Sequence, residues 1–241
     1  MPEPKAFQYS TIDALLDGAY EGSYTVDQLK QKGNFGIGTF NRVDGELVLV
    51  DGEVYKAKSD GTVELAAASE MTPFAVVTTF PTAGEVKYTV TTPTTLKELE
   101  DLLDKGLENK NVFYAIRIEG DFKQMTARAI SPQDKPYKPL AEVAKTQSVF
   151  HYSDTNGVLV AFRSPNFSKG FNVTGYHWHF LSGDKKTGGH VLNLAMTKGV
   201  IKITPVSDIE IKIPTSDMFA NTNQSIDRSS ELKMVEGLRK N

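Results

Sequence analysis

The clearest structural signal in this 241-residue chain is Asn34-Phe-Gly-Ile-Gly-Thr-Phe-Asn-Arg-Val-Asp-Gly-Glu-Leu-Val-Leu-Val-Asp-Gly-Glu-Val-Tyr-Lys-Ala57. Short apolar runs alternate here with the pairs Asp44-Gly45 and Asp51-Gly52, which favour tight turns between antiparallel strands. A third pair, Asp60-Gly61, closes the next hairpin. The stretch therefore predicts a run of adjacent antiparallel strands.

Glycine-containing turns divide much of the remaining chain into short predicted strands. Residues 112–118 and 122–130 are expected to form a hairpin around Gly120, and residues 149–152 and 158–163 to flank a turn at Asn156-Gly157. The other expected strands cover residues 74–80, 87–90, 176–181, 190–196, 200–203 and 209–213.

Helices are predicted to be few and short. Capping patterns, in which a side-chain oxygen accepts from the first turn, occur at Ser10 with Asp13, Thr25 with Gln28, and Thr95 with Glu98. A final helix is predicted over residues 230–238. The sequence thus favours an α+β fold rich in sheet.

A proline-rich segment at residues 131–141 is the best candidate for a linker, since each proline removes a backbone donor. We expect two sheet-rich domains with a shared cleft between them. Residues 1–135 would form an N-terminal mixed-sheet domain with capping helices. Residues 136–241 would form a β-barrel-like C-terminal domain.

Composition excludes several classes of protein. The chain has 27 Lys+Arg against 30 Asp+Glu, so it lacks the basic surface of a nucleic-acid binder. It has no cysteine, which excludes disulfide scaffolds, Cys-rich zinc modules and thiol nucleophiles. Its apolar runs are far shorter than the ~20 residues that span a bilayer. The N-terminus lacks a signal-peptide pattern, so we expect a cytoplasmic protein with no membrane partner.

Three of the four histidines lie within Gly175-Tyr-His-Trp-His-Phe-Leu-Ser-Gly-Asp-Lys-Lys-Thr-Gly-Gly-His190. In a strand His177 and His179 point to the same side. If the hairpin centres between Asp184 and Lys185, His190 lies opposite His179 and shares its face. A single strand histidine is usually structural, as we expect for His151, but three on one face favour a metal site.

Three protein ligands with open positions are typical of a catalytic metal site. Such a site suits an anionic or chelating oxygen substrate and needs acid–base partners. From spacing alone the candidates for these partners are Glu46, Glu53, Arg117, Asp121, Arg128 and Glu236.

Other functions are compatible with a His-x-His strand. Cupin dioxygenases or isomerases share the pair but need a glutamate soon after it, and residues 180–189 contain only Asp184. A zinc hydrolase would use metal-bound water. A non-enzymatic domain would use the histidines only to staple a hairpin, with a fourth ligand that the hairpin does not offer.

Several ordered blocks resemble the α-acetolactate decarboxylase family over nearly the whole chain. They begin at Leu15-Leu-Asp-Gly-Ala-Tyr-Glu-Gly22, Gly33-Asn-Phe-Gly-Ile-Gly-Thr-Phe40 with Asp44-Gly-Glu46, and Phe113-Tyr-Ala-Ile-Arg-Ile-Glu-Gly120 with Thr126-Ala-Arg128. They continue with Gly157-Val-Leu-Val-Ala-Phe-Arg-Ser-Pro165 and the histidine block.

The resemblance implies decarboxylation of 2-acetolactate to (R)-acetoin and CO₂, with a metal that chelates the substrate and stabilises an enediolate. It implies that the metal is zinc, with Fe²⁺ or Mn²⁺ as alternatives, held by His177, His179 and His190. It also implies catalytic roles for Glu46, Arg128 and Glu236, with either glutamate as the proton donor and the other as an alternative metal ligand. Thr39 and Arg128 would bind the substrate.

Two positions depart from the family pattern. Trp178 stands between the ligand histidines and is expected to point away from the metal. Asn193 stands where an aspartate is expected and would weaken the orientation of a ligand histidine. We expect Phe122, Gln124, Thr126 and Arg128 to share the cleft face of one strand, and exposed strand edges make a homodimer the expected assembly.

Overall fold

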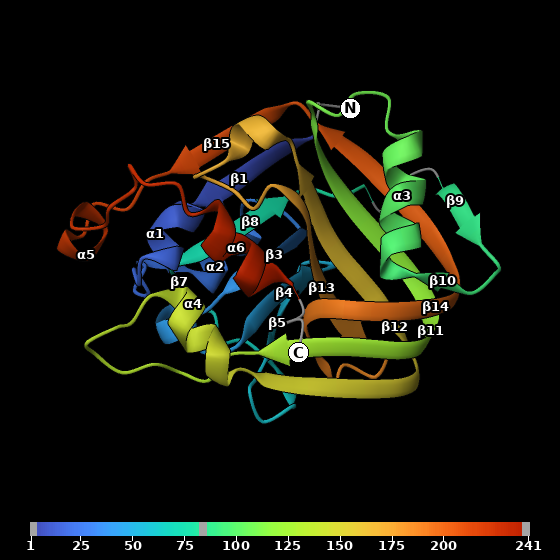
Figure 1. The fold of residues 1–241 in the computed structure, drawn as a ribbon, viewed down its shortest axis with the longest axis horizontal. Helices are drawn as coiled ribbons and strands as arrows, with labels where there is room; N and C mark the ends of the chain where they lie inside the picture. The colour runs from blue at the N-terminus through green and yellow to red at the C-terminus, as the bar shows by residue number, and fades with distance from the viewer. Residues whose placement is uncertain (1–3, 82–85, 238–241) are drawn as a thin grey trace.

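Two β-sheets packed against each other form the framework of this computed structural model, which describes residues 4–81 and 86–237 (Figure 1). Within those residues the first sheet has seven strands, in the order β15 (Asp208–Lys212), β1 (Lys5–Tyr9), β8 (Phe74–Thr78), β3 (Phe35–Thr39), β4 (Glu46–Val50), β5 (Glu53–Ala57) and β6 (Val63–Leu65). The second has six, with the path β10 (Thr94–Thr95), β14 (Gly188–Val206), β11 (Phe113–Ala129), β12 (Ser148–Ser164) and β13 (Gly175–Ser182), while β9 (Val86–Val90) pairs with β14. The predicted α+β fold, mostly strand with short helices, is confirmed.

The first sheet forms as the turn pairs predict. Strands β3, β4, β5 and β6 follow one another as antiparallel neighbours. Alternate residues of β4 face opposite ways: Val48 and Val50 join the core between the sheets, and Leu47 and Leu49 join an outer core under α2 (Val26–Lys30). Strand β15 pairs in parallel with β1, so the last strand of the chain returns to the first.

Three strands of the second sheet are much longer than predicted. β11, β12 and β14 have 17, 17 and 19 residues, and each runs through the position where a hairpin turn or a break was expected. The prediction of turns at Gly120 and Asn156-Gly157 is therefore wrong. Pairing continues through these residues, and the ribbon shows that the long strands curve sharply without a break (Figure 1).

The curve is explained by a row of glycines across the sheet. Gly120 of β11 lies opposite Gly157 of β12 on one side and Gly199 of β14 on the other. A Cβ on Gly157 would lie 2.3 Å from the carbonyl oxygen of Leu181. The backbones pass too closely there for side chains, which is what a tightly coiled sheet requires.

The curled strands also close on themselves. β13 pairs with β12 along its length and with β14 at its end, so the pairing runs from β14 through β11, β12 and β13 back to β14. The predicted barrel-like character of this part of the fold arises from that closure.

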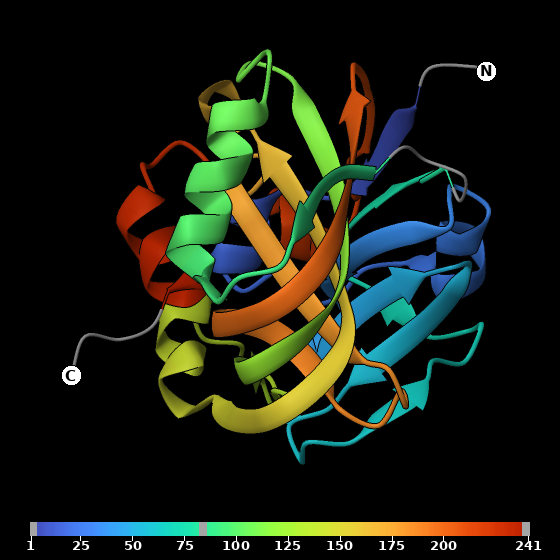
Figure 2. The same cartoon turned by 90° about the vertical axis from the view of Figure 1, so that its right-hand side faces the viewer.

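The helices are short and lie around the sheets. The capping boxes expected at Thr25 and Thr95 are present, and Thr11, rather than Ser10, caps the first helix. Helix α3 (Leu96–Gly106) covers the face of the second sheet that is turned away from the first sheet (Figure 2). The other α-helices are α1 (Ile12–Leu16), α4 (Leu140–Val143), α5 (Asp217–Ala220) and α6 (Ser229–Glu236). Short 3₁₀ turns cover Asn41–Val43, Ala144–Thr146 and Asn166–Ser168. The short strands β2 (Tyr24–Thr25) and β7 (Met71–Thr72) pair with each other, apart from the two sheets.

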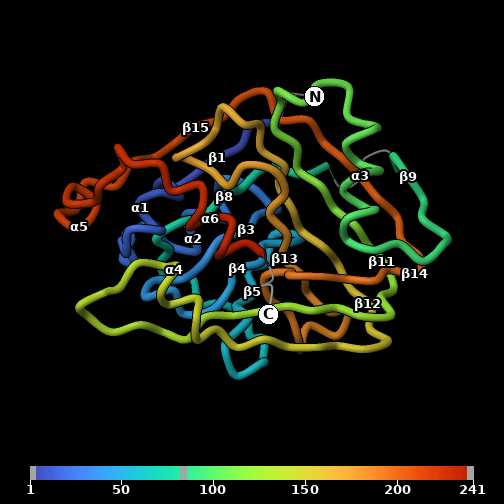
Figure 3. Tube along the Cα trace, viewed as in Figure 1, coloured from blue at the N-terminus to red at the C-terminus, as the bar shows by residue number. Residues whose placement is uncertain are grey.

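The last part of the chain leaves the sheets and crosses α1 before it ends in α6 (Figure 3). The predicted final helix over 230–238 corresponds to α6, and Leu238 lies outside the described residues. In the part of the chain that the structure describes, the helices are all too short or too polar to cross a membrane.

The strands of the two sheets are not separated in the chain by residue 135. The second sheet takes β9, β10 and β11 from before that residue, and β15, from after it, belongs to the first sheet. The division into domains at 135/136 stays a prediction.

Candidate functional site

The histidine hairpin has the predicted register. His179 of β13 lies opposite His190 of β14, and His177 precedes His179 by two residues on the same face. The three imidazole rings have centroids 5.0 to 5.5 Å apart and are buried between the sheets. Trp178 points the other way, as expected, and its indole donates to Glu100 of α3 at 3.0 Å.

Burial favours the neutral form of all three imidazoles. Burial, mutual repulsion and the positive charge of Arg128 hold the pKa of His177 and His190 well below the ordinary value. Burial, with a smaller contribution from Arg128, lowers the pKa of His179 to about 3, although its backbone hydrogen bond acts in the opposite direction. Neutral imidazoles carry the lone pairs that a metal ion needs.

A backbone carbonyl orients one of these rings. Nδ1 of His179 lies 2.9 Å from the carbonyl oxygen of Leu47 in β4. Because a carbonyl only accepts, Nδ1 carries the proton and Nε2 presents its lone pair. The first sheet therefore fixes the tautomer of a histidine that belongs to the second.

Two carboxylates and one guanidinium surround the rings. Arg128 lies next to His190 across the β11–β14 pair, and its Nη1 donates to Oε1 of Glu46 in β4. Glu46 and Arg128 are 5% and 4% exposed, so this ion pair is almost fully shielded from water. Oε2 of Glu46 lies 3.5 Å from Nε2 of His179.

Glu236, at the end of α6, approaches the other two histidines. Its Oε2 lies 3.9 Å from Nε2 of His177 and 3.8 Å from Nε2 of His190. Burial raises the pKa of this carboxyl to about 8, since the attraction of Arg128 offsets only part of the desolvation cost. Burial also raises the pKa of Glu46, against the opposing effect of Arg128.

These residues fit a divalent cation. Each histidine offers a nitrogen, and the three ligand atoms lie within 4.8 Å of one another. Nδ1 of His177, Nε2 of His179, Nδ1 of His190 and Oε2 of Glu236 are buried without a hydrogen-bond partner. Two ligands of a tetrahedral Zn²⁺ lie roughly 3.4 Å apart, close to the separations between Nε2 and the carboxylate oxygens. The buried group of His177, His179 and His190 could bind a metal ion.

A cavity of about 30 Å³ adjoins the group, lined among others by Thr39, Glu46, Arg128, His177 and Glu236. Thr39 lies directly opposite Glu46 on the neighbouring strand, and its hydroxyl donates to the carbonyl of Gly45 at 2.7 Å. The walls come from both sheets and from α6, which lies beside β13, β3 and β4 in Figure 1.

The other acid–base candidates lie elsewhere. Glu53 pairs with Lys30, Arg117 with Asp51, and Asp121 with Lys198. His151 is exposed and lies 3.3 Å from the hydroxyl of Thr126. Spacing alone could not separate these residues from Glu46, Arg128 and Glu236.

Two sequence expectations about neighbouring side chains are wrong. Asn193 is exposed and its Oδ1 accepts from the amide of Leu194, so it orients no histidine. Phe122 does not share the face of Arg128, because the register shifts on both sides of it turn its ring toward Phe180, on the α3 side of the sheet.

Comparison with known proteins agrees with this geometry. The family model of alpha-acetolactate decarboxylase matches residues 6–225. The chain belongs to the alpha-acetolactate decarboxylase family. The alpha-acetolactate decarboxylase of Brevibacillus brevis is 39% identical over 241 residues, which cover 99% of this chain and 84% of that protein. That of Methanosarcina mazei is 41% identical over 230 residues, 95% of this chain and 79% of that protein.

A solved structure of alpha-acetolactate decarboxylase from Bacillus subtilis strain 168 superposes with a TM-score of 0.94 at 34% identity. The match covers 97% of this chain and all of that chain. Membership of this family makes the chain an acetolactate decarboxylase, an enzyme that converts the small molecule acetolactate to acetoin. The family model ends before Glu236, so it is the fold that brings this residue to the site.

Proposed function

We propose that the decarboxylation depends on a divalent metal held by His177, His179 and His190, and that it yields (R)-acetoin and CO₂ from 2-acetolactate. Zinc is the proposed metal, with Fe²⁺ or Mn²⁺ as alternatives, since all three accept imidazole nitrogens. The observation that carries the proposal is the buried group of three histidines, whose ligand nitrogens lie within 4.8 Å of one another beside the carboxyl groups of Glu46 and Glu236.

Arg128 is the proposed carboxylate-binding residue. Its Nη1 is engaged by Glu46, whereas its Nε is buried without a partner and its Nη2 has only a 3.5 Å contact with the carbonyl of Val235. Nε and the second hydrogen of Nη2 would form charge-assisted hydrogen bonds with the carboxylate of the substrate. Thr39, which lies beside Glu46 in the first sheet, would form another part of the wall that binds the substrate.

A bound divalent cation would supply a Lewis acid that polarises the ketone and hydroxyl oxygens of the substrate. The bond to the carboxylate carbon then breaks, CO₂ leaves, and the electron pair stays on the carbon skeleton. Glu46, which accepts a hydrogen bond from Nη1 of Arg128, would orient the substrate hydroxyl.

Glu236 is the proposed proton donor. Burial raises its pKa, and its Oε2 is buried without a hydrogen-bond partner, 3.9 Å from Nε2 of His177 and 3.8 Å from Nε2 of His190. It would deliver its proton to one face of the carbon that has lost CO₂, which sets the (R) centre, and would then recover a proton from water.

The test is an acetoin assay on racemic acetolactate with native, chelator-treated and zinc-restored protein. We expect activity to disappear with the chelator and to return with zinc. His177→Ala should lose both bound metal and activity, while the matched variant His151→Ala should keep both. Full activity in metal-free protein would reject the proposal. Chiral chromatography of the product tests the (R) configuration.

We also propose that the enzyme is a cytoplasmic homodimer. An exposed Leu65 on the edge strand β6 supports self-association, because unpaired strand edges with apolar side chains favour pairing. Sedimentation at micromolar concentration tests the dimer, and cell fractionation tests the location.

A further inference from the structure

Helix α6 carries Glu236 but has little apolar anchoring of its own. Of its eight residues only Val235 is fully buried, with Leu232 partly buried against the same core. The adjoining cavity has room for only about two or three water molecules, so a small displacement of α6 would change both its size and the position of the Glu236 carboxylate.

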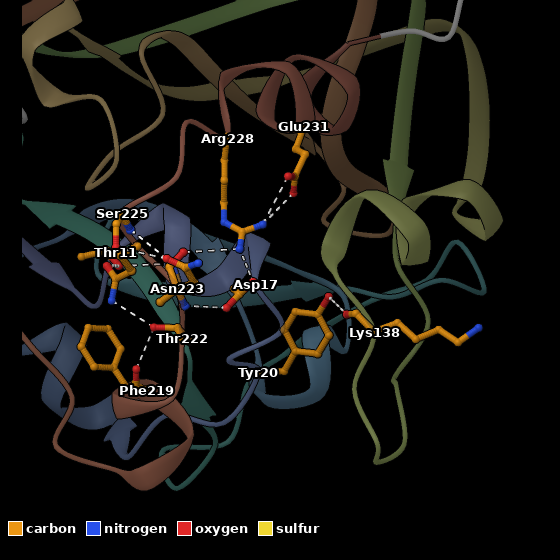
Figure 4. Close-up of polar contacts among 12 residues, drawn as sticks. Thr11, Asp17, Tyr20, Lys138, Phe219, Thr222, Asn223, Ser225, Arg228 and Glu231 are labelled. Atoms are coloured by element: carbon orange, nitrogen blue, oxygen red, sulfur yellow. Dashed lines mark hydrogen bonds and ion pairs between the residues drawn. The ribbon is translucent and has the colours of Figure 1, made fainter.

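An ion-pair network ties the start of this helix to α1. Arg228 directly precedes α6, is 6% exposed, and donates to Asp17 at the end of α1 and to both carboxylate oxygens of Glu231 (Figure 4). Asp17 also accepts from the backbone amide of Asn223 at 2.8 Å. The guanidinium therefore joins α1, α6 and the loop that leads into α6.

The connection reaches the site from both ends. α1 lines the cavity through Ile12 and Leu15, and its capping residue Thr11 donates to Gln224 at 2.6 Å. At the other end of α6, the carbonyl of Val235 lies 3.5 Å from Nη2 of Arg128. A shift of α6 would move these contacts together with Glu236.

We propose that Arg228 is a positioning residue for the decarboxylase site: by seating α6 on Asp17 of α1, it sets the carboxyl of Glu236 against His177 and His190. This inference rests on the function proposed for Glu236. Arg228 itself does not touch the histidines and acts only through the helix that it holds.

The first experiment compares Arg228→Gln and Asp17→Asn with Arg117→Gln. Arg117 is a matched control, because it too is an arginine that joins two carboxylates, Asp51 and Glu119, but it lies away from the site. The measurements are kcat and KM for acetolactate, the Kd for zinc by competition with a chelator, and the melting temperature.

We expect Arg228→Gln to lower kcat at least tenfold with little change in KM, and to raise the Kd for zinc severalfold. Asp17→Asn should give smaller shifts in the same directions, and Arg228→Lys should fall between Arg228→Gln and the unchanged protein. Arg117→Gln should lower the melting temperature without changing kcat or the zinc Kd. Unchanged kcat and zinc Kd in Arg228→Gln would overturn the proposal, as would equal losses in Arg117→Gln.

A double-mutant cycle with Glu236→Gln separates positioning from general stability. If Arg228 acts through Glu236, Arg228→Gln should reduce kcat and zinc affinity far less in the Glu236→Gln background than in the unchanged protein. Equal reductions in both backgrounds would reject the proposal. If Glu236→Gln alone left kcat unchanged, the proposed proton donor would fail, while the zinc Kd of Arg228→Gln would still test the positioning.

Discussion

Two opposite charges lie next to the histidines with almost no contact with water. Arg128 and Glu46 come from different sheets, and each is the charged partner that compensates the other's loss of hydration. Such a pair adds little net stability but makes either residue costly to remove alone, because the survivor is then a buried, uncompensated charge.

Arg128→Met should therefore destabilise the metal-free protein by about 3–5 kcal/mol, measured by urea unfolding in the presence of a chelator. Adding Glu46→Gln should recover most of that stability without restoring acetoin formation. If the double variant remained as unstable as the single one, the cost would come from lost packing and not from the unpaired carboxylate.

Glu100 is a half-buried glutamate that takes no part in the proposed chemistry. Burial raises its pKa, with an opposing effect from the hydrogen bond that Trp178 donates. A carboxyl with a raised pKa binds its proton more tightly in the folded state, so its contribution to stability falls as pH rises above the unfolded pKa. Lys97 and the neighbouring Asp101 and Asp104 face the same carboxyl.

Glu100→Gln keeps an oxygen for Trp178 and removes the ionisation. We expect its melting temperature to match that of the unchanged protein near pH 4 and to exceed it at pH 7–8. Thermal melts across this range, in chelator to avoid metal effects, provide the measurement. A difference that was constant with pH would show that the carboxyl titrates equally in the folded and unfolded states.

At the scale of elements, the row of Gly120, Gly157 and Gly199 lets three neighbouring strands curve together. Gly157→Ala would place a Cβ 2.3 Å from the carbonyl of Leu181 and 2.7 Å from the ring of Phe180. We expect a loss of about 1–3 kcal/mol from overpacking, seen as a melting temperature lower by about 2–4 °C per kcal/mol.

Gly52→Asn is the matched control for that variant. Gly52 has positive φ but an added Cβ meets no atom within 4 Å, and asparagine tolerates this backbone conformation. We expect a much smaller change in melting temperature. An equally large loss in both variants would contradict close packing as the explanation of the glycine row.

The same glycines show what the sequence could predict and what it could not. An Asn-Gly pair is compatible with a hairpin turn and with a curve in a continuous strand. The curve requires glycines at the paired positions of the neighbouring strands, which lie far away in the chain and were not known to pair. The pairing of His179 with His190 was predictable because the turn between them is short and its residues fix its centre. The contact of His179 with the backbone carbonyl of Leu47 could not be predicted, because no side-chain pattern in the sequence marks a backbone group. Glu236 could not be placed either, because only the packing of α6 brings it to the histidines.

At the scale of the whole molecule, the candidate site lies where the two sheets and the last helix meet. The histidines come from the second sheet, while the first sheet supplies Glu46 and the carbonyl that holds His179. A metal bound there would therefore connect parts that are otherwise held by the apolar core between the sheets. The ion should then stabilise the fold as a whole, and not only the hairpin that binds it.

Zinc at a hundred times its Kd should stabilise the chelator-treated protein by about 2.7 kcal/mol, a rise in melting temperature of roughly 5–11 °C for a chain of this size. His179→Ala should abolish this rise, and His151→Ala should retain it. Hydrogen exchange should show increased protection on zinc binding in β4 and α6 as well as in β13 and β14, because the ion restrains the partners of the histidines too. Protection confined to β13 and β14 would show that the metal only staples the hairpin.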